Sequence, residues 1–141
     1  MVTVIRMAEL RAEPLSVDEI RDAVADPAAG AVALFIGTVR DHDQGRGVTA
    51  LSYSAHPTAT AELGRVAEKI AASYPVLALA ITHRTGDLQI GDLAVVAAVA
   101  AAHRDVAFTA CHELVDVVKA TVPIWKHQFF TGGESEWVNS A

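Results

Sequence analysis

The feature that most constrains the fold is a set of uninterrupted apolar runs, each about as long as one strand. The longest covers residues 93–102 (LAVVAAVAAA), and two others read AVALFIGTVR at 31–40 and VLALAITHRTG at 76–86. Apolar runs bounded by glycine or polar residues are typical of strands, and a run of this length is too short to span a bilayer. We therefore expect strands at all three places, with the strand at 31–40 buried.

Three other segments have the signals of helices. Ser16 followed by Glu19 has the spacing of a capping box and predicts a short helix that ends before Gly30. Residues 58–74 carry apolar side chains at helical spacing and stop at Pro75. Residues 105–121 predict a third helix that Pro123 prevents from continuing. Its apolar stripe consists of Phe108, Cys111, Leu114, Val115 and Val118.

The order of these elements sets the fold class. Further strands are predicted at 2–10, 48–57, 124–130 and 135–138, the last two as a terminal hairpin or two short strands, with a loop or lid at 41–47 and a turn region at 86–91. Two strands follow one another without a helix at least twice, which favours a mixed or antiparallel sheet over a parallel one. Without repeats or linkers, residues 1–141 are expected to form one α+β domain with about three helices.

Charge and cysteine content exclude several classes of protein. The chain has a net charge of −6 and no basic run, so it is a poor candidate for binding nucleic acid or an anionic membrane. A single cysteine, Cys111, excludes an internal disulfide and a cysteine-based zinc site, and the six histidines show no metal-ligand spacing. Charge within the first apolar run argues against a signal peptide, so a soluble cytoplasmic protein without a metal is expected.

Two short segments place cations beside apolar elements. In AAAHRDVAF, His103 and Arg104 follow a strand and precede a helix, whose free N–H groups and dipole favour an anion such as phosphate. In FIGTVRDHDQGRG, Arg40 follows an apolar strand that contains Gly37. Each segment alone is also consistent with an ordinary solvated charge at a strand end.

A third segment, VVKATVPIWKHQFF, contains two of the three lysines in the chain. Lys119 continues the third helix near its apolar face, and the break at Pro123 allows Lys126 to return toward it. Two amines that lie close together beside apolar walls have lowered pKa values, and a neutral amine serves as a base or nucleophile. The alternative is that both lysines only favour the negative end of the helix dipole. Together the three segments predict one joint anion site.

Other conspicuous residues have simpler interpretations. Cys111 lies on the apolar stripe of its helix and is expected to be a structural thiol. Trp125 and Phe129 are expected in the core or an interface, whereas His127, which follows Lys126, is as consistent with the joint site as with a structural role. The chain has no G-x-S-x-G, P-loop or G-x-G-x-x-G motif.

The segments FIGTVRDHDQG, HRTGDLQIGD, AAVAAAHRDVAF and VKATVPIWKHQ resemble the large, catalytic subunit of molybdopterin synthase. The resemblance runs in the same order from about residue 31 to 137. It implies an α/β hammerhead fold and a homodimer within a heterotetramer. The partner it implies is a small ubiquitin-like subunit with a C-terminal thiocarboxylate, whose sulfur passes to cyclic pyranopterin monophosphate to form the dithiolene of molybdopterin. No cofactor is implied.

The same resemblance implies a set of site residues. Lys119 and Lys126 would be catalytic and would also bind substrate. Lys119 would transfer protons or stabilise developing negative charge, and Lys126 would orient substrate and lower the pKa of Lys119. The other implied substrate-binding residues are Thr38, Val39, Arg40, His103, Arg104, His127 and Gln128. His103 and Arg104 would face a site that the second protomer completes.

Two positions depart from the family pattern, which often has lysine at Thr38 and arginine at His127. Both departures concern substrate affinity more than the type of reaction. Two alternatives to sulfur transfer remain at this stage: a non-catalytic domain that binds a phosphate ligand, and a scaffold for a ubiquitin-like partner.

Overall fold

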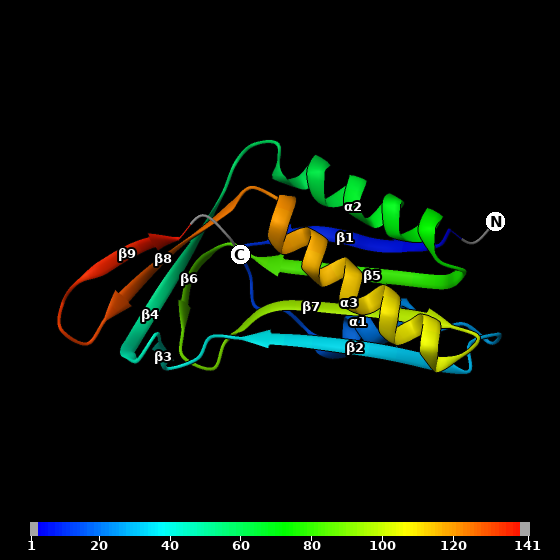
Figure 1. Cartoon of the computed structure of the whole chain (residues 1–141), viewed down its shortest axis with the longest axis horizontal. Helices are drawn as coiled ribbons and strands as arrows, with labels where there is room; N and C mark the ends of the chain where they lie inside the picture. The colour runs from blue at the N-terminus through cyan, green and yellow to red at the C-terminus, as the bar shows by residue number, and fades with distance from the viewer. Residues whose placement is uncertain (1–2, 139–141) are drawn as a thin grey trace.

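The computed structural model describes residues 3–138, which form two sheets and three helices (Figure 1). The larger body is built on a four-stranded sheet of order β1-β5-β7-β2, which comprises β1 (Ile5–Arg11), β5 (Val76–Arg84), β7 (Leu93–Ala101) and β2 (Ala31–Thr38). Strand β1 is parallel to β5, and the other two pairs are antiparallel. The predicted α+β class with a mixed sheet is confirmed.

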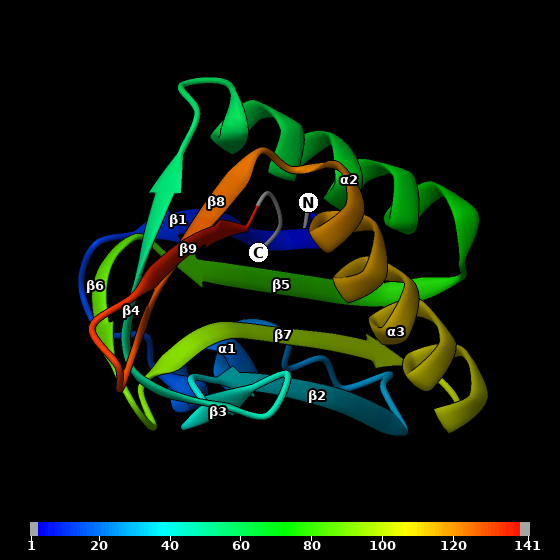
Figure 2. The same cartoon turned by 60° about the vertical axis from the view of Figure 1, so that its left-hand side comes forward.

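Helices cover both faces of this sheet. On one face lie α2 (Ala59–Ser73) and α3 (Arg104–Thr121), and on the other lies the short α1 (Val17–Ala23), as Figures 1 and 2 show. Because side chains alternate along a strand, β7 sends Val95, Ala97 and Val99 into the core beneath α2 and α3. Its residues Val96, Ala98 and Ala100 point into the core beneath α1. Within residues 3–138, no helix is both long and apolar enough to cross a membrane.

The second sheet forms the other end of the molecule, at the left of Figure 1. It contains β3 (His42–Asp43), β4 (Arg46–Ala55), β8 (Ile124–Phe130) and β9 (Ser135–Val138), with β6 (Gly86–Gln89) also paired to β4. All of its pairs are antiparallel. The terminal hairpin is therefore confirmed, whereas the predicted loop 41–47 contains the β3–β4 hairpin and the predicted turn 86–91 contains β6.

Helix boundaries agree with the sequence signals. The Ser16 side chain accepts a hydrogen bond of 3.2 Å from the backbone N–H of Glu19, so it caps α1 as predicted. The carboxylate of Glu19 instead receives two hydrogen bonds from Arg11 on β1. The second half of the capping box is thus used to tie α1 to the edge of the sheet.

The prediction that the strand at 31–40 is buried is wrong. Strand β2 lies at the edge of its sheet, and Val32, Leu34 and Ile36 are 48%, 40% and 42% exposed. These three side chains point to the α1 face, where a helix of seven residues contacts β5 and β7 more than β2. Phe108, expected on the buried stripe of α3, is 66% exposed and lines an open groove with Leu34 and Phe35 of the same edge strand. The remaining four stripe residues, Cys111 among them, are buried as predicted.

Candidate active site

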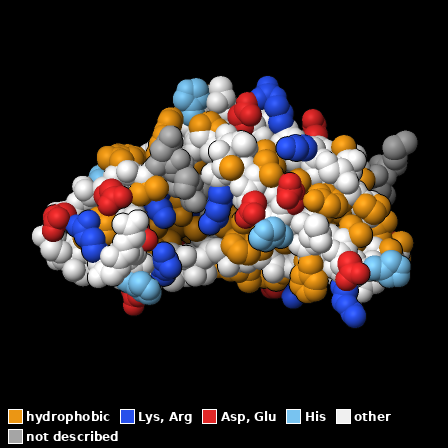
Figure 3. Space-filling view, in the orientation of Figure 1, with side chains coloured by type: hydrophobic (Ala, Val, Ile, Leu, Met, Phe, Trp, Pro, Cys, Tyr) orange, Lys and Arg blue, Asp and Glu red, His pale blue; other side chains and the backbone are white. Residues whose placement is uncertain are grey.

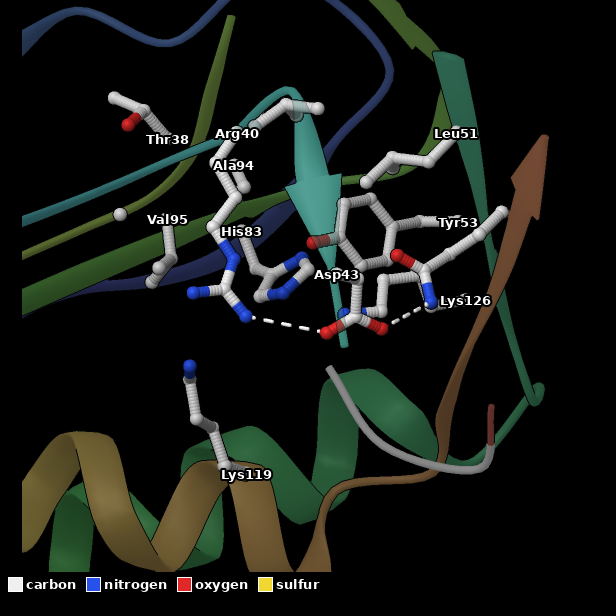
Figure 4. Close-up of a pocket in the computed structure, with 13 residues that line it drawn as sticks. Thr38, Arg40, Asp43, Leu51, Tyr53, His83, Ala94, Val95, Lys119 and Lys126 are labelled. Carbon is white, nitrogen blue, oxygen red and sulfur yellow. Dashed lines mark hydrogen bonds and ion pairs between the residues drawn. The ribbon is translucent and has the colours of Figure 1, made fainter. Parts of the chain in front are cut away.

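A cavity of about 360 Å³ opens where the two sheets meet the end of α3 (Figure 4). Its walls come from the end of β2, the β3–β4 hairpin, β5, β7, the last turn of α3 and β8. The residues that line it are Gly37, Thr38, Val39, Arg40, Asp43, Leu51, Tyr53, His83, Ala94, Val95, Lys119, Lys126 and Gln128. Lys and Arg side chains gather around this hollow in the middle of the molecule (Figure 3).

The two lysines reach the cavity from different elements. Lys119 lies in the last turn of α3, and its side chain projects toward Arg40 (Figure 4). The helix ends at Thr121, the chain becomes extended at Val122, and β8 brings Lys126 back to the same cavity. The return past Pro123 that the sequence predicts is therefore present.

Burial affects the second lysine. Lys126 is half-buried, and its pKa is lowered chiefly by loss of hydration and further by the charges of Lys119 and Arg40, while Asp43 opposes this shift. Lys119 is exposed, although the sequence predicts it near the buried face. The structure thus places an exposed Lys119 at the mouth and a partly desolvated Lys126 deeper in the cavity.

The alternation of side-chain direction along β8 determines which neighbours of Lys126 also line the cavity. Gln128, two residues on, lines the cavity and is buried. His127 lies on the opposite face of the strand, where its ring stacks on Trp137 with centroids 4.2 Å apart and contacts Phe129. The structure does not bring His127 into the cavity, because a single step along a strand reverses the direction of the side chain.

Asp43 connects the cations. Its carboxylate is 3.2 Å from the guanidinium of Arg40 and accepts a hydrogen bond of 2.9 Å from the side-chain amide of Gln128. The hydrogen bond from Gln128, with the charges of Lys126 and Arg40, holds the pKa of Asp43 below its usual value against the effect of burial. Asp43 was not among the sequence candidates, because it belongs to a polar segment with no pattern that separates it from Asp41.

Tyr53 and His83 form the inner wall and were also missed. His83 is 2% exposed, its Nδ1–H donates to the carbonyl of Arg84 over 2.7 Å, and its ring meets Tyr53 edge-on with centroids 4.8 Å apart. Burial lowers the pKa of His83 to about 4, with a smaller contribution from Lys119, and burial raises the pKa of Tyr53 to about 12. The one available signal was a histidine at the end of an otherwise apolar strand.

The structure does not bring His103 and Arg104 to this cavity. Both are exposed at the start of α3 and line a separate hollow with Gly30, Ala31, Ala102 and Asp105. Arg104 and Lys119 are 15 residues apart on one helix, so about 22 Å separate them along its axis. Within one chain, the expected joint site therefore contains Arg40, Lys119 and Lys126 without the His-Arg pair. Thr38 and Val39 do line the cavity.

The site holds three cations and one carboxylate in a chain of net charge −6. Such a local cluster suits a small anionic ligand with a phosphate group. Between residues 3 and 138, no group of three or more His, Cys, Asp or Glu side chains has the arrangement of a metal site.

Fold and site together define an α+β protein with a cationic cavity, and comparisons with known proteins identify its family. Residues 10–121 match the family model described as MoaE protein. The chain is 44% identical over 131 residues to molybdopterin synthase catalytic subunit 1 of Mycobacterium tuberculosis, covering 89% of this chain and 86% of that protein. The chain therefore belongs to the MoaE family of molybdopterin synthase catalytic subunits.

Solved structures agree with this assignment. The crystal structure of molybdopterin synthase from Staphylococcus aureus aligns with a TM-score of 0.86 at 33% identity, covering 92% of this chain and 95% of that one. A complex of subunits 1 and 2 of the molybdopterin-converting factor from Helicobacter pylori aligns with a TM-score of 0.70 at 20% identity, covering 96% and 90%. The latter likeness concerns the fold.

Proposed function

We propose that this chain is a molybdopterin synthase catalytic subunit and that the cavity lined by Arg40, Lys119 and Lys126 is its active site. The observation that carries the proposal is the convergence of Lys119 and Lys126, from a helix end and the following strand, on one cavity with Arg40. Family membership supplies the class of reaction. The reaction is transfer of sulfur from a protein thiocarboxylate to cyclic pyranopterin monophosphate.

Each cation has a distinct role in this proposal. Arg40 and Lys126 hold the phosphate, with Thr38, Val39 and Gln128 as further contacts on the same walls. Lys119, exposed at the mouth, stabilises the negative charge that develops as the acyl–sulfur bond of the donor breaks, and supplies a proton where one is needed. Burial of Lys126 strengthens its interaction with the phosphate, because water screens a half-buried charge less.

The sulfur donor is a small ubiquitin-like partner whose C-terminal tail carries the thiocarboxylate. Cys111, the only cysteine, is 5% exposed and burial raises the pKa of its thiol to about 11, so it is poorly suited to carry the sulfur itself. A neighbouring apolar groove between β2 and α3, lined in part by Phe35, Phe108 and Val115, shares Lys119 with the cavity. An extended tail has room to reach the lysine through it. The H. pylori protein of the same fold is in a complex of subunits 1 and 2 of the molybdopterin-converting factor.

A homodimer would give His103 and Arg104 a role. Both are about 22 Å along α3 from Lys119, so within one chain they cannot hold the same small substrate. Edge strand β2 exposes Val32, Leu34 and Ile36, which is the kind of surface that a second copy covers. In the proposed assembly the His-Arg pair of one protomer completes the cavity of its partner, within a heterotetramer with two small subunits.

The test is an assay for molybdopterin with the purified chain, a thiocarboxylated small subunit and cyclic pyranopterin monophosphate. Lys119→Ala should lose most activity, at least a hundredfold, while partner binding is retained. Lys69→Ala is the matched control, because Lys69 is an exposed lysine of α2 away from the cavity. Equal activity of the Lys119 and Lys69 variants would remove Lys119 from its role. A native chain that binds the small subunit yet forms no product would support a scaffold instead.

A further inference from the structure

The cavity contains one anion of its own, the carboxylate of Asp43. It contacts Arg40 at 3.2 Å and Gln128 at 2.9 Å, and the two contacts are drawn as dashed lines in Figure 4. Its side chain is only 23% exposed, whereas that of Arg40 is 68% exposed. A partly exposed carboxylate in the wall of a cationic cavity opposes an anionic ligand, so its presence calls for an explanation.

The carboxylate is held in place by the fold. Asp43 ends the two-residue strand β3, and the tight turn that follows uses Gln44 and Gly45 with positive φ angles of 51° and 77°. From the opposite side, Gln128 is 3% exposed and donates its amide hydrogen to the carboxylate. Asp43 is thus fixed from two elements that lie far apart in the sequence, and it stays ionised because its pKa is lowered.

A fixed negative charge changes the selectivity of the cavity as well as its affinity. Three cations and one carboxylate give a net charge of +2 in place of +3. The Coulomb energy between Asp43 and a bound anion is proportional to the charge of that anion. A doubly charged group is therefore penalised twice as much, in free energy, as a singly charged group in the same position.

We propose that Asp43 is an internal counter-ion that reduces the preference of the cavity for doubly charged phosphate monoesters over singly charged phosphodiesters. This proposal deepens the proposed function, on which its biological meaning rests, since the cyclic phosphate of the substrate is a diester with one negative charge. A phosphate monoester carries about two negative charges at neutral pH and is abundant among metabolites. Asp43 thereby disfavours the commoner competitors of the substrate.

The test is Asp43→Asn, which removes the charge and keeps the size and hydrogen-bonding shape of the side chain. The probes are methyl phosphate and dimethyl phosphate, titrated into the native chain and the variant at about pH 8 and constant ionic strength, with binding followed by NMR chemical shifts. Removing one unit charge at contact distance is expected to tighten dimethyl phosphate binding about fivefold. Methyl phosphate binding should tighten by the square of that factor, about 25-fold.

Asp41→Asn is the matched control, because Asp41 carries the same charge two residues away in the same segment. Its side chain is 77% exposed, pairs with His42 and does not line the cavity. This variant should change either affinity less than twofold. Equal tightening of both probes in Asp43→Asn would overturn the proposal, because the effect of the carboxylate would then not depend on the charge of the bound anion. Weaker binding of both would also overturn it and make Asp43 a positioning residue for Arg40.

The proposed function and the role of Asp43 can be refuted independently of each other. The probe titrations need no sulfur transfer and no partner, so they measure charge selectivity alone. If methyl phosphate binding tightens by the square of the factor for dimethyl phosphate, but no molybdopterin is formed, the counter-ion is upheld and the proposed function is refuted. Normal product formation by the native chain, with equal tightening of the two probes in Asp43→Asn, would uphold the proposed function and refute the counter-ion.

Discussion

The buried imidazole of His83 predicts how the stability of this protein depends on pH. Its pKa is about 4 in the folded chain, compared with about 6.5 in an unfolded one. Between these two values the unfolded chain binds a proton at His83 that the folded chain does not bind. The free energy of unfolding therefore falls as the pH falls from about 6.5 to about 4, and His83 causes no further loss below that.

The size of the effect follows from the same two values. A difference of 6.5 minus 4, at 1.36 kcal/mol per pKa unit, corresponds to about 3 kcal/mol of stability lost across this window. No discount for solvent screening is needed, because His83 is 2% exposed. For a domain of ordinary stability this is a large fraction of the total.

The assay compares the native chain with His83→Phe by urea unfolding between pH 7 and pH 4, with tryptophan fluorescence as the signal. The variant keeps a ring of similar shape and loses the hydrogen bond to the Arg84 carbonyl, so at pH 7 it should be about 1–2 kcal/mol less stable. Because it lacks the titrating group, its stability should fall about 3 kcal/mol less toward pH 4. The two stability curves are therefore expected to cross.

His112→Gln serves as the control, since it removes a histidine whose side chain is 76% exposed on α3. Its stability curve should run parallel to that of the native chain. A parallel curve for His83→Phe as well would refute the reasoning, because it would mean that His83 takes up its proton equally in both states.

Four other perturbations test the packing and the site. Leu114→Ala should cost about 2–5 kcal/mol in urea unfolding, because Leu114 is fully buried between α3 and the sheet. Gly30→Ala should cost about 1–3 kcal/mol, since the added Cβ would clash with the backbone carbonyl oxygen of Ala102. Gly64→Ala in α2, where a Cβ meets nothing within 4 Å, should stabilise by about 0.5–1 kcal/mol. Lys126→Met should weaken phosphate binding without lowering the melting temperature, because it removes a half-buried charge and keeps the apolar stem.

Each of these expectations has a contrary outcome. A loss below 1 kcal/mol at Leu114 would mean that the neighbouring side chains collapse into the space. Equal effects at the two glycines would show that contact with Ala102 is relieved by a shift of the backbone. Unchanged phosphate binding in Lys126→Met would leave Arg40 and Lys119 as the cations that hold the ligand.

The sequence predicts the meeting of the two lysines because the signals that control it are local. A helix that carries Lys119 near its end, a proline that stops it and a strand that carries Lys126 are all read within a dozen residues. The boundaries of α2 and α3 are predicted equally well, since capping, proline and apolar spacing act over one or two turns.

Burial at the sheet edge is less predictable. An apolar run indicates a strand but not its position in the sheet, so β2 appears buried in the sequence and lies at an edge in the structure. The same applies to Phe108, whose position on the apolar stripe is correct although the sheet beneath it ends at β2. Strand order depends on pairings between distant residues, which a periodic pattern does not encode.

Only part of the site was predicted, because some of its contacts also join residues that are distant in the sequence. His103 and Arg104 were grouped with the lysines by chemistry, yet the length of a helix separates them within one chain. Asp43 and His83 were missed because each acquires its surroundings from another element, Gln128 on β8 and Tyr53 on β4. Their importance lies in contacts between segments up to 85 residues apart.

The alternation of β8 also determines which insertions and deletions this chain tolerates during evolution. One extra residue between Thr121 and Lys126 would exchange the two faces of the strand, turning the lysine out and His127 in. An insertion in the turn at 131–134, beyond the last residue that lines the cavity, would leave that orientation intact. Length variation among related sequences should therefore accumulate in this turn and be absent from the link between α3 and β8, which alignments of the family can examine.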